Sequence, residues 1–434
     1  MNVAVIGAGY VGLTSGAVLA DQGNRVWVVR RDRKKIDDLK KGIVPIYEPG
    51  LSEIVLRNVK AGRLIPTTSY AECVPNADVV FIAVGTPQDE KNGAADLSQV
   101  FTAAEEIARN LKEGYTVVVD KSTVPPGTAE AVTDVINKHR KNARVKFDVV
   151  SSPEFLREGC AVEDTTHPDR IVIGTESKKA RSTMVKLHQA FKSPLVLTGV
   201  RSAEIIKYSA NAYLSLRIGF IDQIANLCEK MGADIDDIIC GIGLDHRIGT
   251  HYWFPGLGYG GYCFPKDVNA LAALFGKIGE KDNLFTRLDE FNRGRVERLM
   301  KKIKNISGNL RGLHIGILGL AAKQKTDDIR CSKAIELALA LKKAGAVIKA
   351  YDPLALENAR FVLGRKITYA PDLYSAAAGN DCLIITIEAL EFAKMDLKRI
   401  RQSLKKPVIF DIRNALDAKK AVRFGLTVYG TGKP

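Results

Sequence analysis

Short apolar runs alternate with polar or helix-spaced segments along the first half of the chain. The first run is Asn2–Ile6, a segment with apolar residues at helical spacing extends to about Leu19, and a second run covers Arg25–Val29. Later runs read ADVVFIAVG, TVVVDKS, FDVVSS and RIVIG. Such runs are typical of buried strands, and strands that alternate with helices are typical of a mostly parallel sheet with helices on both faces. We therefore expect an α/β fold in this half.

The pattern changes between about Ser202 and Met231. This stretch has apolar residues at helical spacing on more than one face and contains no proline, so it predicts one long helix. Because such a helix needs burial on several sides, we expect it between domains or at a subunit interface. The stretch that follows, GTHYWFPGLGYGGYCFPKD, is rich in glycine and aromatic residues and is typical of a functional loop.

The alternating pattern starts again after about Asn309, with runs in LHIGILGL, AVIKAYDP, DCLIITIE and KPVIFDIRN. The prediction is an α/β protein with two Rossmann-like, doubly wound sheet domains joined by a long central helix. We place the domains at residues 1–200, 201–300 and 301–434. The length of 434 residues agrees with this division, since domains average ~150 residues.

Composition narrows the class of protein. Apolar residues make up 46% and charged residues 26%, which is ordinary for a soluble globular chain and excludes a disordered one. No apolar run approaches the ~20 residues of a membrane span, and the first residues lack the basic segment of a signal peptide. We therefore expect a cytoplasmic protein that does not bind a membrane.

The charge balance is basic, with 64 Lys and Arg against 49 Asp and Glu and a net charge of +15. The basic residues are spread along the chain, and no nucleic-acid-binding signature is present. Nucleotides and sugar phosphates account for the surplus at least as well as nucleic acid, so we expect no nucleic-acid partner.

The chain has seven cysteines, an odd number, and no C-x-x-C pair. This pattern argues against a disulfide framework and against a structural zinc site, and it favours a reducing compartment. We expect no bound metal.

A glycine loop follows the first predicted strand and opens the first predicted helix. It reads Gly7-Ala8-Gly9-Tyr10-Val11-Gly12, which is the GxGxxG fingerprint in its required context. Gly7 permits the tight turn, Gly9 lets the backbone approach a diphosphate, and Gly12 lets the helix pack on the strand. The alternative is a bare tight turn, but the context favours nucleotide binding at the helix N-terminus.

Three further places carry candidate chemistry. Cys263 stands in GGYCFPKD with charged neighbours, so it is either a thiolate nucleophile or a buried structural cysteine. Two carboxylates and an arginine follow a strand in SPEFLREG (152–159), where doubly wound sheets bind ligands; the alternative is a helix N-terminal turn with acids near its dipole. Lys207 and Asn211 share one face of the long helix and are either catalytic or an interdomain polar bridge.

Motifs in one order cover nearly the whole chain: GAGYVGL (7–13), IYEPGL (46–51), VGTP (84–87), ADLS (95–98), KSTVPPGT (121–128), PEFLREG (153–159), HPDRIVIG (167–174), KYSANAYL (207–214), DHRIG (245–249), GYGGYCFPKD (258–267), KTDDIR (325–330), YDP (351–353) and DIRN (411–414). Together they resemble the UDP-glucose 6-dehydrogenase family, within the wider nucleotide-sugar dehydrogenases. The resemblance implies oxidation of the C6 alcohol of UDP-glucose to a carboxylate. It also implies two hydride transfers through a thiohemiacetal and a thioester, a nicotinamide coenzyme and a UDP-sugar-binding third domain. The apolar character of the long helix separately predicts a two-fold homodimer built largely from that helix.

The resemblance also implies site residues. The catalytic set is Cys263 as nucleophile with Lys207, Asn211, Asp267, Thr123 and Glu154. The expected coenzyme contacts are Gly7, Gly9, Tyr10, Val11, Gly12, Arg30, Lys35, Gly85, Thr86, Thr123, Glu158, Lys266 and Arg330; of these, the glycines follow from the fingerprint and Arg30 from its place after the second strand. The substrate contacts are Glu154, Phe155, Leu156, Arg157, Lys207, Asn211, Arg247, Tyr252, Gly260, Cys263, Lys323 and Arg413, with Arg247 expected to reach into a partner subunit.

Three alternatives stay open on the residues alone. The same chemistry could act on GDP-mannose or on a UDP-N-acetylhexosamine, although DHRIGTHY followed by GYGGYC resembles the UDP-glucose enzymes more. A single-step dehydrogenase of the hydroxyacid type needs no cysteine and forms one reduced coenzyme per product instead of two. The third alternative is a non-catalytic nucleotide-sugar-binding protein that kept the fold. The presence of Cys263, Lys207 and Asp267 argues against it.

The chain departs from the family in several places. Ser152 stands for an asparagine; Ala322, Gln324 and Lys325 stand for phenylalanine, proline and asparagine; Asp222-Gln223 stands where bacterial relatives often carry Asn-Glu. Arg30 lies where an acid usually accepts the ribose 2′-OH of NAD, 18 residues past Gly12. A guanidinium there suits the 2′-phosphate of NADP, whereas Asp32 in that role would favour NAD, the family default. We therefore expect NADP, alone or beside NAD.

Overall fold

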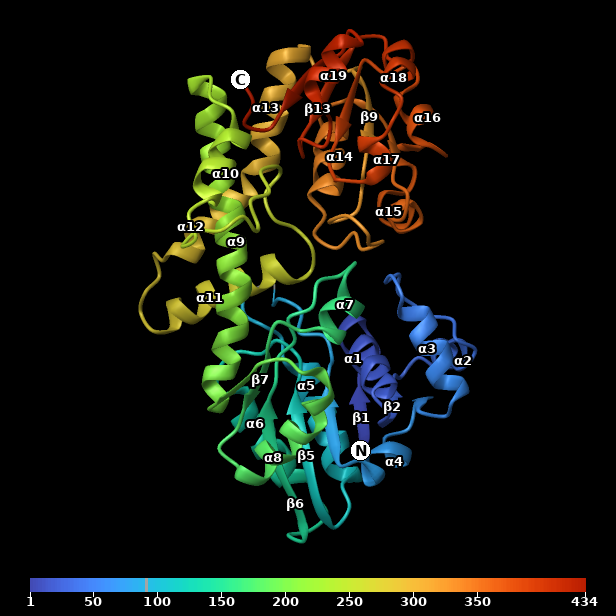
Figure 1. Cartoon of the computed structure of the whole chain (residues 1–434), viewed down its shortest axis with the longest axis vertical. Coiled ribbons are helices and arrows are strands. Elements are labelled where there is room, and N and C mark those ends of the chain that lie inside the picture. Colours follow the sequence, from blue (N-terminus) through green and yellow to red (C-terminus); the bar gives the residue numbers. More distant parts are fainter. Residues whose placement is uncertain (90–92) are drawn as a thin grey trace. The chain divides into compact units, whose positions relative to one another are not determined.

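The chain folds into two units, Met1–Ala210 and Asn211–Pro434, each of which is built around a sheet of wholly or mostly parallel strands (Figure 1). The structure is a computed structural model and describes residues 1–89 and 93–434. The predicted class, an α/β fold with two Rossmann-like sheet domains and a long central helix, is confirmed.

The first unit contains an eight-stranded sheet in the order β3-β2-β1-β4-β5-β6-β7-β8. All neighbouring strands run parallel except β6 and β7. The strands are β1 (Asn2–Ile6), β2 (Arg25–Val29), β3 (Leu64–Thr67), β4 (Val79–Ile82), β5 (Gly114–Asp120), β6 (Val145–Ser151), β7 (Ile171–Gly174) and β8 (Leu195–Thr198).

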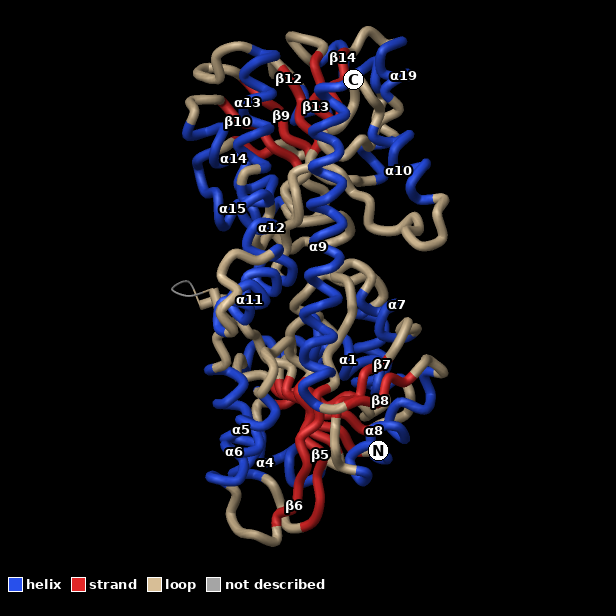
Figure 2. Tube along the Cα trace, turned by 90° about the vertical axis from the view of Figure 1, so that its left-hand side faces the viewer, coloured by secondary structure: helices blue, strands red, loops and turns tan. Residues whose placement is uncertain are grey.

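Helices cover both faces of this sheet, as Figure 2 shows. Alternate strand residues point to opposite faces, so Val3 and Val5 pack with one helix layer and Ala4 and Ile6 with the other. This double burial explains why the strands are almost wholly apolar. One layer holds α1 (Tyr10–Asp21), α2 (Arg33–Lys40), α3 (Leu51–Lys60), α7 (Ala161–Thr166) and α8 (Lys178–His188). The other holds α4 (Tyr70–Cys73), α5 (Ser98–Asn110) and α6 (Thr128–His139).

The predicted site segments of this unit follow the ends of neighbouring parallel strands. Strands β1, β2, β4, β5 and β6 lie side by side, and their carboxyl ends meet at one edge of the sheet. The glycine loop, Arg30, VGTP, KSTVPPGT and PEFLREG each begin within two residues of one of these ends. Ligands of doubly wound sheets bind at this edge, so the topology gathers the candidate residues there.

The second unit combines helices with a six-stranded sheet. Helix α9 (Val200–Met231) enters it from the first unit and is the predicted long helix, two residues longer at its start. After it come α10 (Ile235–Gly243), α11 (Cys263–Lys277), α12 (Leu284–Arg293) and α13 (Arg295–Ser307). The predicted functional loop ends earlier than expected, because Cys263 is already the first residue of α11.

The second sheet is parallel throughout, in the order β11-β10-β9-β12-β13-β14. Its strands are β9 (His314–Leu318), β10 (Val347–Tyr351), β11 (Thr368–Tyr369), β12 (Cys382–Ile385), β13 (Val408–Asp411) and β14 (Thr427–Gly430). One face packs against α13, α14 (Lys333–Lys343) and α15 (Leu356–Leu363). The other packs against α16 (Leu373–Ala377), α17 (Leu390–Ala393), α18 (Leu397–Ser403) and α19 (Ala418–Arg423).

Candidate functional site

The glycine loop is crowded on its inner side and open on its outer side. Gly7 has φ +113°, and a Cβ on it would lie 2.2 Å from the carbonyl oxygen of Ala83. A Cβ on Gly12 would lie 2.0 Å from the carbonyl oxygen of Gly7, while one on Gly9 would meet open space. Helix α1 begins after Gly9 without a side-chain cap, so its first N–H groups face this space. The loop therefore fits the diphosphate of a dinucleotide.

Arg30 follows β2 and bonds to the glycine loop, because its Nη1 donates to the carbonyl oxygen of Ala8 at 2.9 Å. Asp32, the alternative reader of the ribose, caps α2 by accepting the backbone N–H of Lys35 at 3.1 Å. Its carboxylate therefore already has a structural role at the start of α2. Arg31 and Arg33 are exposed on either side of it.

The PEFLREG segment is held by an acid from far away in the sequence. The buried carboxylate of Glu48 accepts the backbone N–H groups of Gly159 and Ala161, both at 2.7 Å. Gly159 has φ +84°, a conformation that favours glycine. Glu48 belongs to the IYEPGL motif, but only the fold reveals that it fixes the loop carrying Glu154 and Glu158.

Lys207 and Glu154 form a buried ion pair, with 2.9 Å between Nζ and Oε1. The second oxygen of Glu154 accepts the backbone N–H of Leu156 at 2.7 Å, and the Lys207 ammonium lies 5.3 Å from the ring centre of Phe155. The structure thus brings together four predicted substrate contacts of the first unit.

Lys121 is a neighbour of this pair that the sequence analysis did not single out. Burial lowers the pKa of Lys121 to about 8; the Glu154 carboxylate opposes this shift and Lys207 adds to it. Its position as the first residue of KSTVPPGT is the only sequence signal that could have found it. Thr123, in the same motif, and Thr86, in VGTP, are both buried.

In the second unit the nucleophile candidate lies at a helix N-terminus beside two charged side chains. Cys263 is the first residue of α11, and Lys266 and Asp267 follow within its first turns. Lys266 Nζ lies 2.6 Å from one oxygen of Asp267, and Asn211 donates to the other oxygen at 2.6 Å. Burial disfavours the charged form of Lys266, but Asp267 and the Cys263 thiol raise its pKa overall.

Helix α9 carries both Lys207 and Asn211, one turn apart. Each has a buried acid as partner, Glu154 for the lysine and Asp267 for the asparagine. These partners explain how the two polar side chains are tolerated at buried positions of this helix.

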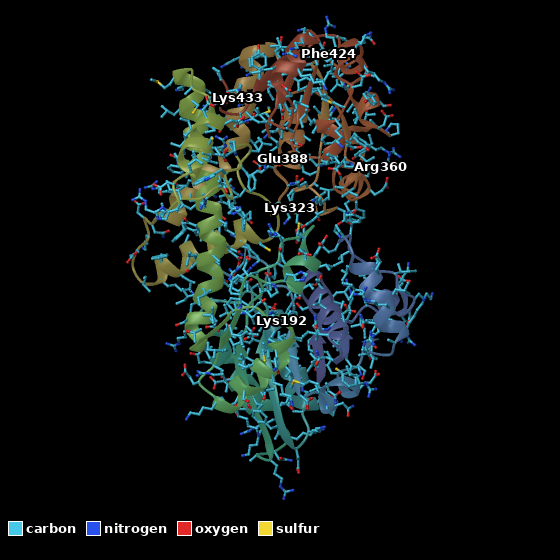
Figure 3. The ribbon with its side chains drawn as sticks, viewed as in Figure 1. Lys192, Lys323, Arg360, Glu388, Phe424 and Lys433 are labelled. Carbon is cyan, nitrogen blue, oxygen red and sulfur yellow. The ribbon has the colours of Figure 1, made fainter. Side chains whose placement is uncertain are left out.

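The remaining predicted substrate and coenzyme contacts of the second unit lie in loops. Lys323, labelled in Figure 3, is exposed in the loop after β9. Arg413 follows β13 and pairs with Glu388 at 2.9 Å. Arg330 pairs with Asp328 at 2.8 Å, and its guanidinium lies 4.3 Å from the ring centre of Tyr262.

Two predicted arginines are exposed and paired with nearby acids. Arg157 makes bidentate bonds to Asp164, and Arg247 makes them to Asp245. Tyr252 has φ +65°, and its ring packs 6.4 Å from that of Phe264. A Cβ on Gly260 would lie 2.6 Å from the carbonyl oxygen of Cys331, so this position requires glycine.

The described residues contain neither a metal-binding cluster nor a membrane-spanning helix. Across residues 1–89 and 93–434, no group of three His, Cys, Asp or Glu side chains is arranged to hold a metal ion. Over the same ranges, none of the helices combines the length and the apolar character needed to cross a membrane.

The fold and the glycine loop define a two-sheet, dinucleotide-binding protein of the dehydrogenase class. The chain belongs to the UDP-glucose/GDP-mannose dehydrogenase family, since it matches the family's NAD binding domain over residues 1–192, its central domain over 201–294 and its UDP binding domain over 316–418. The family confirms a nicotinamide coenzyme.

Similar proteins span the whole chain. A UDP-glucose 6-dehydrogenase of Rhizobium meliloti is 45% identical over 444 residues, covering all of both chains. The UDP-glucose 6-dehydrogenase TuaD of Bacillus subtilis is 42% identical, covering all of this chain and 93% of its own. The solved structure of a UDP-glucose dehydrogenase from Pyrobaculum islandicum is 36% identical with a TM-score of 0.93, covering all of this chain and 98% of its own.

Proposed function

We propose that the protein oxidises UDP-glucose to UDP-glucuronate in two successive two-electron steps, with Cys263 holding the substrate carbon between them. The observation that carries this proposal is the position of Cys263 at the N-terminus of α11, with Lys266, Asp267 and Asn211 linked by hydrogen bonds behind it. The two relatives above, both named UDP-glucose 6-dehydrogenases, support the choice of sugar nucleotide.

The site suits a thiolate. The N–H groups at the start of α11 favour negative charge, and the Lys266 ammonium adds a cation next to the thiol. Asp267 fixes this cation through a 2.6 Å contact. The thiolate adds to the carbonyl carbon of the C6 aldehyde and forms a thiohemiacetal, and the second oxidation converts this adduct to a thioester.

Lys207 and Asn211 stabilise the oxygen at C6. The ammonium and the amide are hydrogen-bond donors fixed by buried acids, so they can stabilise developing negative charge without first reorganising. A nicotinamide coenzyme, when bound, would supply the hydride acceptor, with a fresh oxidised molecule needed for each of the two oxidations. Glu154 and Thr123 hold the water that attacks the thioester carbon, which releases the carboxylate and returns the Cys263 thiol.

We propose that the coenzyme is NADP, alone or beside NAD, and that Arg30 contacts its 2′ position. The bond from Arg30 to Ala8 keeps a guanidinium at the edge of the diphosphate loop. A carboxylate at that place would repel a 2′-phosphate, whereas a guanidinium binds it with charge-assisted bonds. The capping bond of Asp32 supports this assignment over the alternative.

We also propose a homodimer formed along α9, in the cytoplasm. Tyr213, Phe220 and Leu227 recur every seven residues on this helix with 57%, 47% and 56% of their surface exposed. An exposed apolar stripe of this spacing is typical of a helix that packs against a partner. The division into domains 1–200, 201–300 and 301–434 belongs to the same proposal, with Lys323 and Arg413 of the third domain binding the UDP.

Turnover across nucleotide sugars tests the assignment. Reduced coenzyme is measured with UDP-glucose, GDP-mannose, UDP-N-acetylglucosamine and UDP-N-acetylmannosamine, each with NAD and with NADP. The proposal predicts the highest kcat/KM with UDP-glucose, by at least tenfold. A higher kcat/KM with another sugar nucleotide would contradict the choice of UDP-glucose and would support the same reaction on that substrate instead.

A further inference from the structure

A buried ion pair joins helices α9 and α13 beneath the loop that leads to Cys263. Arg295 Nη2 lies 3.1 Å from Asp222 Oδ1, and the two side chains are only 6% and 0% exposed. Removing two charges from water costs several kcal/mol per ion, and a buried pair is therefore weak evidence for stability. The contacts of this pair suggest another reason for its presence.

Both members of the pair form hydrogen bonds with the backbone of Gly256. The backbone N–H of Gly256 donates to Asp222 Oδ1 at 2.7 Å, and Arg295 Nε donates to the carbonyl oxygen of Gly256 at 3.1 Å. A third nitrogen of Arg295 donates to the side chain of Asn226 at 2.7 Å. Both backbone polar groups of Gly256 are thus held by side chains that also hold each other.

The next residues of the loop are fixed in turn. Asn292 accepts the backbone N–H of Tyr259 at 2.8 Å and donates to its carbonyl oxygen at 3.0 Å. Gly258 lies between Gly256 and Tyr259 and has φ +87°. A Cβ on Gly258 would lie 2.1 Å from Asn292 Oδ1. Only three residues lie between Tyr259 and Cys263, so the bonds to Gly256 and Tyr259 determine the path of the chain into α11.

Gly256 also adjoins a predicted substrate contact. A Cβ on Gly256 would lie 3.0 Å from Nη1 of Arg413. The guanidinium of Arg413 therefore lies close to Gly256. The Asp222–Arg295 pair therefore supports both the loop to Cys263 and the backbone beside Arg413.

We propose that Asp222 and Arg295 are positioning residues for the reaction: as a charged pair they hold Gly256, and through it they set the approach of the Cys263 thiol. The inference rests on the proposed role of Cys263 as nucleophile. It assigns a function to two residues that touch neither the reacting carbon nor the coenzyme in the mechanism above.

Because Asp222 is titratable, we expect the interaction of the Asp222–Arg295 pair with Gly256 to depend on pH. Burial raises the pKa of Asp222 to about 6, while the cations that face it, Arg295 on α13 and Arg413 after β13, and the N–H groups of Gly256 and Gly258 limit the rise. Below pH 6 the carboxyl is protonated and no longer neutralises Arg295. We therefore expect kcat to fall as the pH decreases through about 6, and we expect this limb to be absent in Asp222→Asn.

A double-mutant cycle tests the pair. Asp222→Asn and Arg295→Gln each leave one buried group without its counter-charge, so each should lower kcat at least tenfold. The double variant leaves neither charge buried without its partner, so its kcat should exceed that of either single variant. Effects that simply multiply in the double variant, or single variants with unchanged kcat, would overturn the proposal.

A second ion pair between the same two helices is the matched control. Glu229 and Lys302 lie seven residues beyond Asp222 and Arg295, with 2.8 Å between Oε1 and Nζ, but they contact Gly432 and Gly430 instead of the cysteine loop. Glu229→Gln should leave kcat within twofold. An equal loss in Glu229→Gln would mean that helix packing alone explains the result.

The alkylation rate of Cys263 by iodoacetamide separates this inference from the proposed function. Each single variant should change the alkylation rate of Cys263 by at least fivefold, and the double variant should change it less than either single variant does. Activity retained in Cys263→Ser would refute the proposed function and leave this readout intact. An unchanged alkylation rate would refute the inference alone. If Arg295→Gln does not fold, Arg295→Lys, which keeps the charge but not the fork of donors, should show the same loss.

Discussion

Arg30 donates a hydrogen bond from Nη1 to the carbonyl oxygen of Ala8, at 2.9 Å. This bond joins the residue after the second strand to the glycine loop after the first strand, which are neighbours in the sheet. The bond therefore anchors the guanidinium that we propose to contact the 2′ position of the coenzyme.

Arg30→Asp should reverse the preference between the two coenzymes. A carboxylate in this place accepts the ribose 2′-OH and repels a 2′-phosphate, so kcat/KM with NADP should fall at least tenfold while that with NAD rises. Steady-state rates with each coenzyme provide the measurement, and Arg33→Asp, on the exposed start of α2, is the control. At least a tenfold preference of the unmodified enzyme for NAD would exclude Arg30 as the reader of the 2′ position. So would an unchanged preference in Arg30→Asp.

Phe220→Glu should turn the proposed dimer into a monomer. Phe220 lies in the middle of the exposed apolar stripe of α9, and a buried unpaired carboxylate at an interface is strongly unfavourable. Light scattering at micromolar protein gives the mass. Lys138→Glu, an exposed position on α6 and away from the stripe, should leave the dimer intact. A monodisperse monomer for the unmodified protein would contradict the proposal.

Lys325→Asn should stabilise the protein. Lys325 has φ +59° in an exposed loop, a left-handed conformation that asparagine tolerates better than lysine. Relief of this strain is worth about 1 kcal/mol, which urea unfolding can measure. Gln324→Asn, next to it and without positive φ, should change the free energy of unfolding by much less. A destabilised Lys325→Asn variant would show that the lysine side chain has a contact of its own to lose.

Asp120→Asn should make the protein more stable in alkaline solution. Burial, and then the nearby Glu204, raise the pKa of Asp120 to about 8 from the 3.8 of a free side chain. Between about pH 4 and pH 8 the unfolded chain releases this proton and the native protein keeps it, so stability is lost as the pH rises through this window.

Asparagine is neutral at every pH and removes that loss. At pH 9 we expect Asp120→Asn to exceed the unmodified protein by more than about 1 kcal/mol in the free energy of unfolding, with a smaller difference at pH 4. Asp134→Asn, exposed on α6, should show no such pH dependence. An equal effect of Asp120→Asn at pH 4 and pH 9 would contradict the raised pKa.

The strands and the central helix could be predicted from the sequence because the pattern of apolar residues along each element indicates which of its faces are buried. Strands covered on both faces are almost wholly apolar, as in Val3–Ile6, and α9 is apolar on more than one face. Short edge strands such as β11 (Thr368–Tyr369) have too few residues to give such a signal. The start of α11 at Cys263 was missed because the glycines and aromatic residues before it are typical of a loop.

Some of the site residues could likewise be predicted from the sequence, and others could not. Cys263, Lys207 and Asp267 stand out because their residue types suggest chemistry. Glu48 acts through a hydrogen bond to a residue 111 positions away, and Asp222 and Arg295 meet across 73 positions. Bonds of this kind depend on the tertiary fold and leave no local pattern, so only the structure could reveal them.

The number of reduced coenzymes formed per UDP-glucuronate tests the account most directly, with Cys263→Ser as the decisive variant. A nucleophile that holds the carbon through two oxidations requires two reduced coenzymes per acid. In Cys263→Ser the overall turnover should fall by orders of magnitude, with an ester adduct accumulating because an ester hydrolyses more slowly than a thioester. Cys240→Ser, an exposed thiol on α10, should retain the rate. The account predicts a ratio of two and an inactive Cys263→Ser; a ratio of one, or a Cys263→Ser enzyme with near-normal turnover, would contradict it.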